Sequence, residues 1–243
     1  MRQDAGAGGE ARVKVCAVIP AYNEGKRILP VLNTLDAAAS VHEILVVDDG
    51  SLDDTFAVAC SHPACETGRI RVLQHNPNRG KGAAMRTGAE TTSAEVIVFF
   101  DADLVGLTPA HVNSVVLPVA SGRAAMALGV FRGGRGATTL AQILAPNISG
   151  QRAIRRDVFQ SIPCLTKAGY GVELAITNYV LGEGLPITRV VLNDVTHPMK
   201  EEKLGFFRGA ASRMRMYWQM LPYLARGLFR RRRNRLVQKD RLE

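Results

Sequence analysis

Short hydrophobic runs alternate along the chain with stretches in which hydrophobic residues recur at helical spacing. The short runs predict strands over residues 13–20, 43–47, 70–74, 95–100, 124–131, 151–155 and 187–195. The helical stretches cover residues 24–39, 53–60, 80–91, 108–120 and 172–181. Asp53 and Thr108 are the expected N-cap residues of two of these helices. Most of the strand runs are continuously apolar, which is typical of strands buried on both faces. The order of elements predicts an α/β fold, with a mostly parallel sheet flanked by helices.

Polar residues gather where four of the predicted strands end. They form the segments PAYNE at 20–24, DDGS at 48–51, NPNRGKG at 76–82 and DAD at 101–103. The carboxyl ends of parallel strands meet at one edge of a sheet, and in open sheets this edge binds ligands. Acids, amides and glycines at such an edge suit a nucleotide-bearing ligand together with its metal ion.

Asp101 and Asp103 directly follow the most hydrophobic of the predicted strands. Two carboxylates separated by one residue can share Mg²⁺ or Mn²⁺, and a cation held in this way commonly bridges substrate phosphates. An isolated pair of this kind is more often a turn or a helix cap. Because three other polar segments are expected at the same edge, we interpret this pair as a metal site.

Several classes of protein are excluded by the motifs. Segment 78–82 is not a P-loop, since His75 stands where the first glycine of that motif would be. The glycine-rich run at 133–139 fails the dinucleotide-binding pattern at its last position. The five histidines are scattered along the chain, so a zinc hydrolase is unsupported.

Composition and charge narrow the choice further. The chain has 243 residues, of which 47% are hydrophobic, and this suits one large globular domain or two small ones. Residues 204–243 contain 11 Lys and Arg against 2 Asp and Glu, so they carry the whole net charge of +9. A protein that wraps nucleic acid with its main fold would spread basic residues over that fold, so no nucleic-acid partner is expected. The four cysteines include no CxxC pair and are predicted to be reduced.

Four motifs, in their order and spacing, resemble the nucleotide-sugar domain of family 2 glycosyltransferases. They are PAYNE at 20–24, VDDGSLDDT at 47–55, NRGKGAA at 78–84 and DADL at 101–104. Within that family the chain is most similar to dolichyl- or polyprenyl-phosphate sugar synthases and to glucosyl-phosphoglycerate synthases. The resemblance implies a catalytic domain of the GT-A (Rossmann-like) fold over residues 12–203. A basic amphipathic helical tail is expected over residues 204–243.

The resemblance also implies roles for individual residues. Those implied to bind the nucleotide-sugar donor are Pro20, Ala21, Tyr22, Glu24, Asp48 or Asp49, Gly80, Lys81, Asp101 and Ala102. Asp101 and Asp103 are implied to hold Mg²⁺ or Mn²⁺ on the diphosphate of a UDP- or GDP-sugar. His197 matches a late histidine that ligates the metal in some GT-A enzymes, including the phosphoglycerate type. Its alternative is a surface histidine at a strand end.

Later segments are similar to parts of the family that lie near the acceptor. Residues 150–156, GQRAIRR, are similar to the family's SGFRxYRR segment. Arg132 matches an arginine that contacts the acceptor phosphate in the lipid-phosphate enzymes. Any of Arg132, Arg152 and Arg155 could bind an anionic acceptor through paired hydrogen bonds.

Two further residues bear on the expected chemistry. Glu173, in a segment similar to the family's GYGVE, is the candidate general base for a hydroxyl acceptor. Its alternative role is an acid that favours a helix N-terminus electrostatically. Val105 departs from the DADLQ pattern of many lipid-phosphate enzymes, in which Gln is a further metal ligand. Valine cannot coordinate a metal, which leaves a position for His197 to fill.

The C-terminal segment combines an amphipathic pattern with a polybasic run. Apolar residues from Phe207 to Leu228 recur at helical spacing, and residues 230–235 read RRRRNR. This combination is typical of an anchor on an anionic membrane surface. The alternatives are packing on the chain's own domain, a contact in a homodimer, and a nucleic-acid tail. No signal peptide and no membrane-spanning run are predicted, so we expect a cytoplasmic protein, peripheral on the inner face of the membrane.

The leading hypothesis is a metal-dependent, inverting glycosyltransferase that moves a sugar from a nucleotide donor to a polyprenyl phosphate. A soluble acceptor such as phosphoglycerate is the alternative within the same class. A nucleotidyltransferase and a basic nucleic-acid-binding module are the alternatives from other classes. A nucleotidyltransferase should have a Gly- and Arg-rich loop after its first strand, where this chain has PAYNE.

Overall fold

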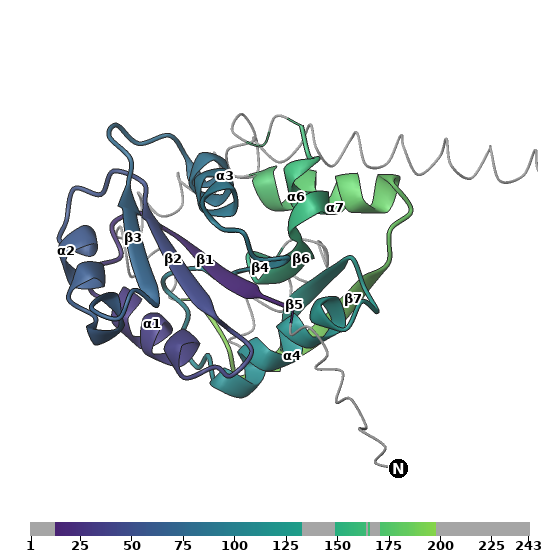
Figure 1. Ribbon diagram of the computed structural model, residues 1–243, viewed down its shortest axis with the longest axis horizontal. Coiled ribbons are helices and arrows are strands. Elements are labelled where there is room, and N and C mark those ends of the chain that lie inside the picture. The colour runs from purple at the N-terminus through teal and green to yellow at the C-terminus, as the bar shows by residue number, and fades with distance from the viewer. Residues whose placement is uncertain (1–12, 133–148, 164, 166–170, 198–243) are drawn as a thin grey trace, which may run out of the picture.

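The computed structural model describes residues 13–132, 149–163, 165 and 171–197, which form a sheet with helices on both sides (Figure 1). The sheet has seven strands in the order β3-β2-β1-β4-β6-β5-β7. In chain order the strands are β1 Val15–Ala21, β2 Glu43–Asp48, β3 Ile70–Gln74, β4 Val96–Phe99, β5 Met126–Arg132, β6 Arg152–Arg155 and β7 Ile187–Asn193. Strands 1 to 4 pair in parallel, as do β5 and β7, whereas β6 runs antiparallel to both β4 and β5. The predicted α/β fold with a mostly parallel sheet is therefore confirmed.

Helices cover both faces of this sheet. Their bounds are α1 Ile28–Asp36, α2 Thr55–Cys60, α3 Lys81–Thr91, α4 Pro109–Ala120, α6 Arg156–Gln160 and α7 Val172–Gly182, with a 3₁₀ turn at Pro63–Cys65. Helices α1 and α4 lie on one face, and α3, α6 and α7 lie on the other (Figure 1). The sheet is therefore shielded from water on both sides, which explains its continuously apolar strands.

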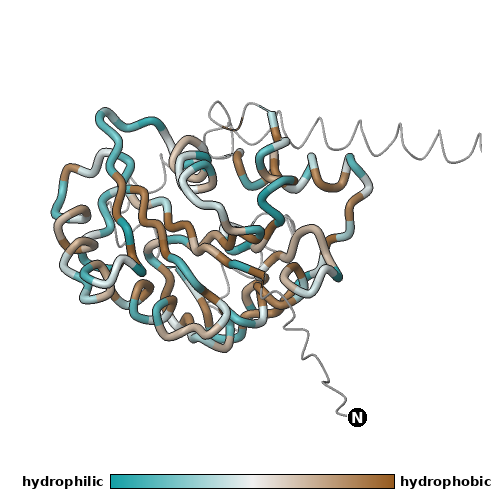
Figure 2. The backbone as a smooth tube through the Cα atoms, in the orientation of Figure 1, coloured by the Kyte–Doolittle hydropathy of each residue, from teal (hydrophilic) through white to brown (hydrophobic). Residues whose placement is uncertain are grey.

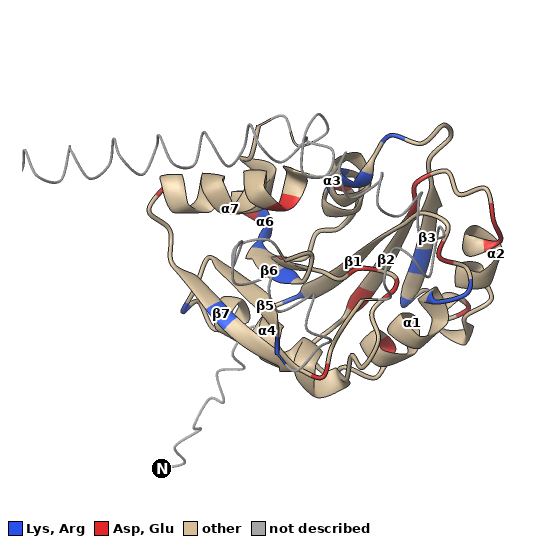
Figure 3. Ribbon diagram, turned by 180° about the vertical axis from the view of Figure 1, so that it is seen from behind, with Lys and Arg blue, Asp and Glu red and all other residues tan. Residues whose placement is uncertain are grey.

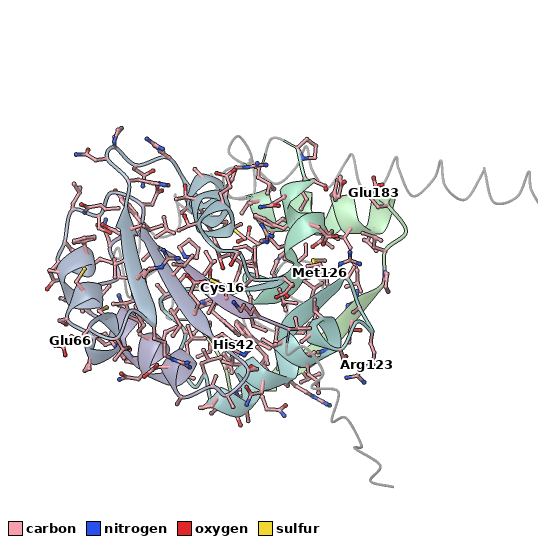
Figure 4. All side chains as sticks on the ribbon, in the orientation of Figure 1. Cys16, His42, Glu66, Arg123, Met126 and Glu183 are labelled. Carbon is pink, nitrogen blue, oxygen red and sulfur yellow. The ribbon has the colours of Figure 1, made fainter. Side chains whose placement is uncertain are left out.

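Successive side chains of the central strand enter two different cores. Ala17 and Ile19 of β1 pack toward α1 and α4, whereas Cys16 and Val18 pack toward α3 and α7. Strands of hydrophobic residues therefore fill the centre of the molecule, and segments of hydrophilic residues lie at its periphery (Figure 2). In the side-chain view, Cys16 lies inside the fold (Figure 4). Burial raises the pKa of its thiol to about 12, which suits the predicted reduced, structural cysteine.

Several element boundaries differ from the sequence-based expectation. Helix α1 begins at Ile28 rather than at residue 24, and α2 begins at Thr55 rather than at residue 53. The short helix α6, which directly follows β6, was not predicted. Thr108 does cap α4, since its side chain accepts a hydrogen bond from the backbone N–H of His111.

Asp53 is not the N-cap residue of α2, although its carboxylate does receive backbone N–H groups. It accepts from Thr55 N at 3.0 Å and from Gly25 N at 3.2 Å, so it joins the start of α2 to the segment after β1. The N-cap position itself belongs to Asp54, whose side chain makes no capping hydrogen bond.

The predicted tail over residues 204–243 and the boundary proposed at residue 203 lie outside the described residues. Among the helices that the structure does describe, none is both long enough and apolar enough to cross a membrane.

Candidate active site

The segments that follow β1 and β2 are joined side by side at the carboxyl edge of the sheet. The backbone N–H of Asn23 donates to Ser51 Oγ at 2.9 Å, and the N–H of Leu52 donates to Asn23 Oδ1 at 2.8 Å. The backbone N–H of Glu24 donates to Thr55 Oγ1 at 2.8 Å. Asn23 adopts a φ of 55°, a left-handed conformation that Asn tolerates better than most residues. The two motifs therefore form one rigid unit.

The residues predicted to bind the nucleoside lie on this unit with different exposures. Pro20 and Glu24 are half-buried and Ala21 is buried, whereas the ring of Tyr22 is 45% exposed. An exposed tyrosine at the edge of a sheet offers an aromatic face on which a base can stack.

Asp49 is buried beneath the segment that carries NRGKG. Its carboxylate accepts hydrogen bonds from the backbone N–H groups of Arg79 at 2.9 Å and Gly80 at 2.7 Å. The imidazole of His75 contacts the same carboxylate at 2.7 Å, and its other nitrogen contacts Thr87 Oγ1 at 2.9 Å. Asp49 therefore holds the segment before α3 in place, a role that the sequence did not indicate.

Asp48 also has internal partners. Its Oδ1 accepts from both the N–H and the hydroxyl of Ser51, and its Oδ2 accepts from Gln74 Nε2 at 2.9 Å. Both predicted base- or ribose-binding aspartates are thus largely occupied within the protein. Between them, Gly50 has a φ of 72°, and a Cβ there would lie 2.9 Å from Asn78 N, so only glycine fits this turn.

Lys81 links two carboxylates that come from distant parts of the chain. Its Nζ lies 2.7 Å from Asp101 Oδ1, which follows β4, and 2.6 Å from Glu173 Oε1, in the first turn of α7. In the charge-coloured view, helices α3 and α7 lie next to each other, with basic residues on α3 and acidic residues on α7 (Figure 3). The fold brings these three predicted site residues together.

The charges in this group shift the pKa values of its members. Burial by itself would lower the pKa of Lys81, but the nearby carboxylates of Asp101 and Glu173 outweigh burial and raise it. Burial would likewise raise the pKa of Asp101, but the ammonium of Lys81 and the imidazole of His197 hold it below its usual value. Lys81 is therefore cationic and Asp101 anionic at neutral pH.

His197 lies against both aspartates of the DAD segment. Its Nδ1 is 3.1 Å from Asp103 Oδ1, and its Nε2 is 3.5 Å from Asp101 Oδ2. Two backbone hydrogen bonds of 3.0 Å between Val105 and Thr196 bring the two segments together. His197 therefore lies beside both aspartates, with 34% of its side chain exposed.

The donor set at this point suits a hard divalent cation. Carboxylate oxygens are the ligands that Mg²⁺ and Mn²⁺ prefer, and one imidazole is compatible with them. In the described part of the chain, no three His, Cys, Asp or Glu side chains surround a common point as metal ligands do. The carboxylates of Asp101 and Asp103 instead contact Lys81 and His197. A metal ion held here would replace some of these contacts.

The three candidate acceptor-binding arginines have different surroundings. Arg152 has no exposed surface, and its guanidinium donates to the backbone carbonyl oxygens of Ser149 and Glu173. Burial lowers the pKa of Arg152 to about 10. Arg155 is exposed and paired with Asp157, and Arg132 is exposed at the end of β5. These surroundings favour a structural role for Arg152 and leave Arg132 and Arg155 exposed.

Gln151 is a site residue that sequence reasoning missed. Its side chain is 1% exposed, and its Nε2 donates to Asp101 Oδ2 at 2.8 Å. The segment before β6 aligns with a family pattern in which this position is Phe, so the motif itself gave no signal. Only the antiparallel pairing of β6 with β4 brings it to Asp101.

A family model described as "Glycosyl transferase family 2" matches residues 16–170 of the chain. The chain is 29% identical over 194 residues to a glucosyl-3-phosphoglycerate synthase of Mycobacterium tuberculosis, covering 67% of this chain and 59% of that relative. It is 38% identical over 105 residues to a human dolichyl-phosphate beta-glucosyltransferase, covering 37% of this chain and 31% of that relative. The chain thus spans less than two thirds of the length of these curated relatives.

Solved structures give a longer match. A glucosyl-3-phosphoglycerate synthase of Mycobacterium tuberculosis, in complex with Mn²⁺, UDP and glucosyl-3-phosphoglycerate, superposes with a TM-score of 0.67 at 27% identity. This match covers 88% of the present chain and 80% of the other. A complex of the same synthase with Mg²⁺ and UDP gives a TM-score of 0.63 at 26% identity, covering 84% and 79% of the two chains.

Proposed function

We propose that this chain, which belongs to glycosyltransferase family 2, transfers a sugar from a UDP-sugar to a phosphate-bearing acceptor in a metal-dependent reaction. The observation that carries the proposal is the group formed by Asp101, Asp103, His197, Lys81 and Glu173. It combines ligands for a divalent cation with an ammonium group that can contact a diphosphate. Complexes of the mycobacterial relative with Mn²⁺ or Mg²⁺ and UDP support the same choice of donor and metal.

The residues of the chain would share the work as follows. Asp101 and Asp103 would hold the cation, with His197 as a third ligand. The bound cation would stabilise the negative charge that develops on the departing diphosphate. Tyr22 would stack on the base, and Lys81 would exchange its carboxylate contacts for phosphate oxygens. A phosphate oxygen that attacks the sugar is already ionised at neutral pH and needs no base. A hydroxyl group of phosphoglycerate must lose a proton when it attacks, and Glu173, which contacts Lys81, would accept that proton.

For the acceptor, the extent of similarity favours a small soluble phosphate such as phosphoglycerate. The match to the phosphoglycerate enzyme covers 67% of this chain, whereas the match to the human dolichyl-phosphate enzyme covers 37%. The contact of His197 with Asp103 supports the same choice, since a late metal-binding histidine is a feature of the phosphoglycerate type. Arg132 is our candidate for contacting the acceptor phosphate, because it is exposed at the end of β5 and matches an arginine that contacts the acceptor phosphate in the lipid-phosphate enzymes.

A transfer assay with full-length protein tests this proposal. UDP-glucose and Mn²⁺ are supplied with either 3-phosphoglycerate or a short-chain polyprenyl phosphate, and UDP release and product mass are measured. We expect transfer to the soluble acceptor, complete loss of turnover with EDTA, and a rise in melting temperature with UDP-sugars only when Mn²⁺ is present. GDP- and dTDP-sugars serve as controls for the base. If no UDP-sugar binds and no phosphate acceptor is modified, the proposal fails.

A polyprenyl phosphate is the second candidate, and the basic C-terminal segment favours it. Residues 230–235 contain five arginines in six positions, and each basic residue near an anionic surface contributes about 1 kcal/mol of attraction. We expect full-length protein to float with vesicles that contain anionic lipid. A variant with these five arginines changed to Gln should float at least about tenfold less.

The salt dependence of flotation provides a control, because screening weakens charge attraction within a Debye length of about 10 Å at 0.1 M salt. Neutral vesicles should capture neither protein. Equal flotation of the two proteins would exclude the polybasic run as a membrane anchor. Absence of flotation in both would remove the support that the C-terminal segment gives to a polyprenyl phosphate acceptor.

A further inference from the structure

Asp101 is held at both of its carboxylate oxygens, by two donors of different chemistry. Lys81 contacts Oδ1 at 2.7 Å, and Gln151 Nε2 contacts Oδ2 at 2.8 Å. Lys81 begins a helix on one side of the group, whereas Gln151 lies immediately before strand β6. The two donors fix the orientation of the carboxylate from opposite ends.

The amide of Gln151 has only one suitable orientation. With its nitrogen toward Asp101, its Oε1 lies 3.0 Å from Ser149 Oγ, whose single proton has the carbonyl oxygen of Gly129 as a nearer acceptor. The reversed amide would set Oε1 against the Asp101 carboxylate, and two acceptors would then face each other. Gln151 is almost fully buried, at 1% exposure, so its amide is shielded from bulk water. Its donor is therefore fixed on Asp101.

The backbone before Gln151 also fits closely against the same carboxylate. A Cβ at Gly150 would lie 2.2 Å from Asp101 Oδ2, which is far inside contact distance. The backbone of Gly150 therefore packs directly against the Asp101 carboxylate, and the amide of Gln151 donates to it from the next position. Segment 149–151 thus fixes both the place and the rotation of this side chain.

The neutral donor Gln151 and the cationic donor Lys81 differ in whether they can stay on Asp101 when Asp101 binds a metal ion. The ammonium group of Lys81 repels a cation held by Asp101. Under the proposed function, this ammonium group leaves Asp101 and contacts the phosphate oxygens of the donor. The amide of Gln151 carries no net charge, so it can keep its hydrogen bond while Asp101 ligates a metal. An ionised carboxylate offers about four lone-pair sites, and Gln151 takes only one of them. The side of Oδ2 that approaches His197 at 3.5 Å remains available.

We propose that Gln151 is a positioning residue of the divalent-cation site, which holds Asp101 in the ligating orientation by the hydrogen bond from Nε2 to Oδ2. The inference rests on the proposed function, because it requires Asp101 to be a metal ligand. Gln151 occupies a position that is Phe in the similar family segment. In many lipid-phosphate enzymes a metal-coordinating Gln stands two residues after the aspartate pair, where this chain has Val105. In this chain the amide beside Asp101 comes instead from Gln151, which directly precedes strand β6.

The test measures Mn²⁺ binding itself, by calorimetry with full-length protein, in the presence of UDP and without any sugar or acceptor. Gln151→Met preserves the length of the side chain and removes only its polar end. We expect this variant to bind Mn²⁺ about tenfold more weakly than the unmodified protein, which is typical when a partner of a ligating carboxylate is lost. Its metal-free melting temperature indicates whether the fold itself is affected.

Gln74→Met is the matched control. Gln74 Nε2 donates to Asp48 Oδ2 at 2.9 Å, so this variant removes the same kind of bond from an aspartate outside the metal site. Both variants are also titrated with Mn²⁺ in the absence of UDP, because Asp48 belongs to the implied nucleoside pocket. Under that condition the Mn²⁺ affinity of Gln74→Met should be unchanged. Equal weakening in both variants would mean that the effect is a general loss of structure, and the positioning role would be rejected.

Gly150→Ala supplies a second route if the Gln151 variant does not fold. The added methyl group would displace Asp101 from the amide without removing that amide, and Mn²⁺ should again bind more weakly. Unchanged affinity in whichever of the two variants folds overturns the inference, while the proposed function stands. If the unmodified protein binds no Mn²⁺ with UDP, the proposed function fails and takes this inference with it.

Discussion

Replacement of Asp101 by Asn should lower the rate of sugar transfer at least about 100-fold while the protein stays folded. The amide has nearly the same shape as the carboxylate but lacks the charge that a divalent cation requires. A bound cation contributes several kcal/mol to stabilising the departing diphosphate, and each 1.36 kcal/mol corresponds to a tenfold change in rate. Lys81 keeps its contact with Glu173 at 2.6 Å, so the local fold should survive.

The measurement is UDP release at saturating donor, together with a Mn²⁺ titration of the same variant. Asp157→Asn is the matched control, since that carboxylate is 62% exposed and forms a surface ion pair with Arg155. Surface pairs of this kind contribute little, and the control should retain the normal rate. A normal rate in Asp101→Asn would remove this residue from the proposed metal site.

The largest effect on stability is expected from Asp49→Asn. The Asp49 carboxylate is 4% exposed and receives the N–H groups of Arg79 and Gly80 and the imidazole of His75. Asn would replace one acceptor oxygen with an NH₂ group, and this donor would face the backbone N–H of Arg79 or of Gly80. The loss of a buried, charge-assisted hydrogen bond and the exposure of an unmatched donor should cost about 3 kcal/mol.

Thermal unfolding followed by circular dichroism measures this loss. For a protein of this size, about 3 kcal/mol corresponds to a fall of roughly 6–12 °C in the melting temperature. Asp36→Asn is the control, because Asp36 pairs with Arg69 at 2.6 Å with about a third of each side chain exposed. It should change the melting temperature by less than about 4 °C. Equal falls in the melting temperature of the two variants would show that the buried Asp49 carboxylate stabilises the fold no more than the exposed Asp36 carboxylate does.

The two predictions depend on aspartates that the sequence made conspicuous in the same way, yet their surroundings differ. Both Asp49 and Asp101 follow a hydrophobic strand and belong to a motif of the family. The turn at Gly50 and the segment 78–80 close over Asp49, so it acts within the fold. Asp101 keeps 19% of its side chain accessible and faces Lys81, Glu173 and His197. A motif identifies both residues, but only burial and partners separate their roles.

The sequence by itself determined the layered architecture and the edge that carries the site. Strands buried on both faces must be apolar at every position, and polar residues are therefore concentrated where those strands end. Such patterns are local, since each depends on residues adjacent along the chain. The motifs around Asp48, Lys81 and Asp101 are accordingly recognisable in the order of residues alone, as is the N-cap at Thr108.

Tertiary structure alone decided which side chains from distant segments meet. The antiparallel insertion of β6 between β4 and β5 sets Gln151 on Asp101 and buries Arg152 completely. Backbone pairing of Val105 with Thr196 brings His197 to the aspartates, across about 90 residues of chain. These contacts join residues 50 or more positions apart, and no periodicity or spacing along the sequence encodes such a distance. They follow only from the packing of strands whose order in the sheet differs from their order in the chain.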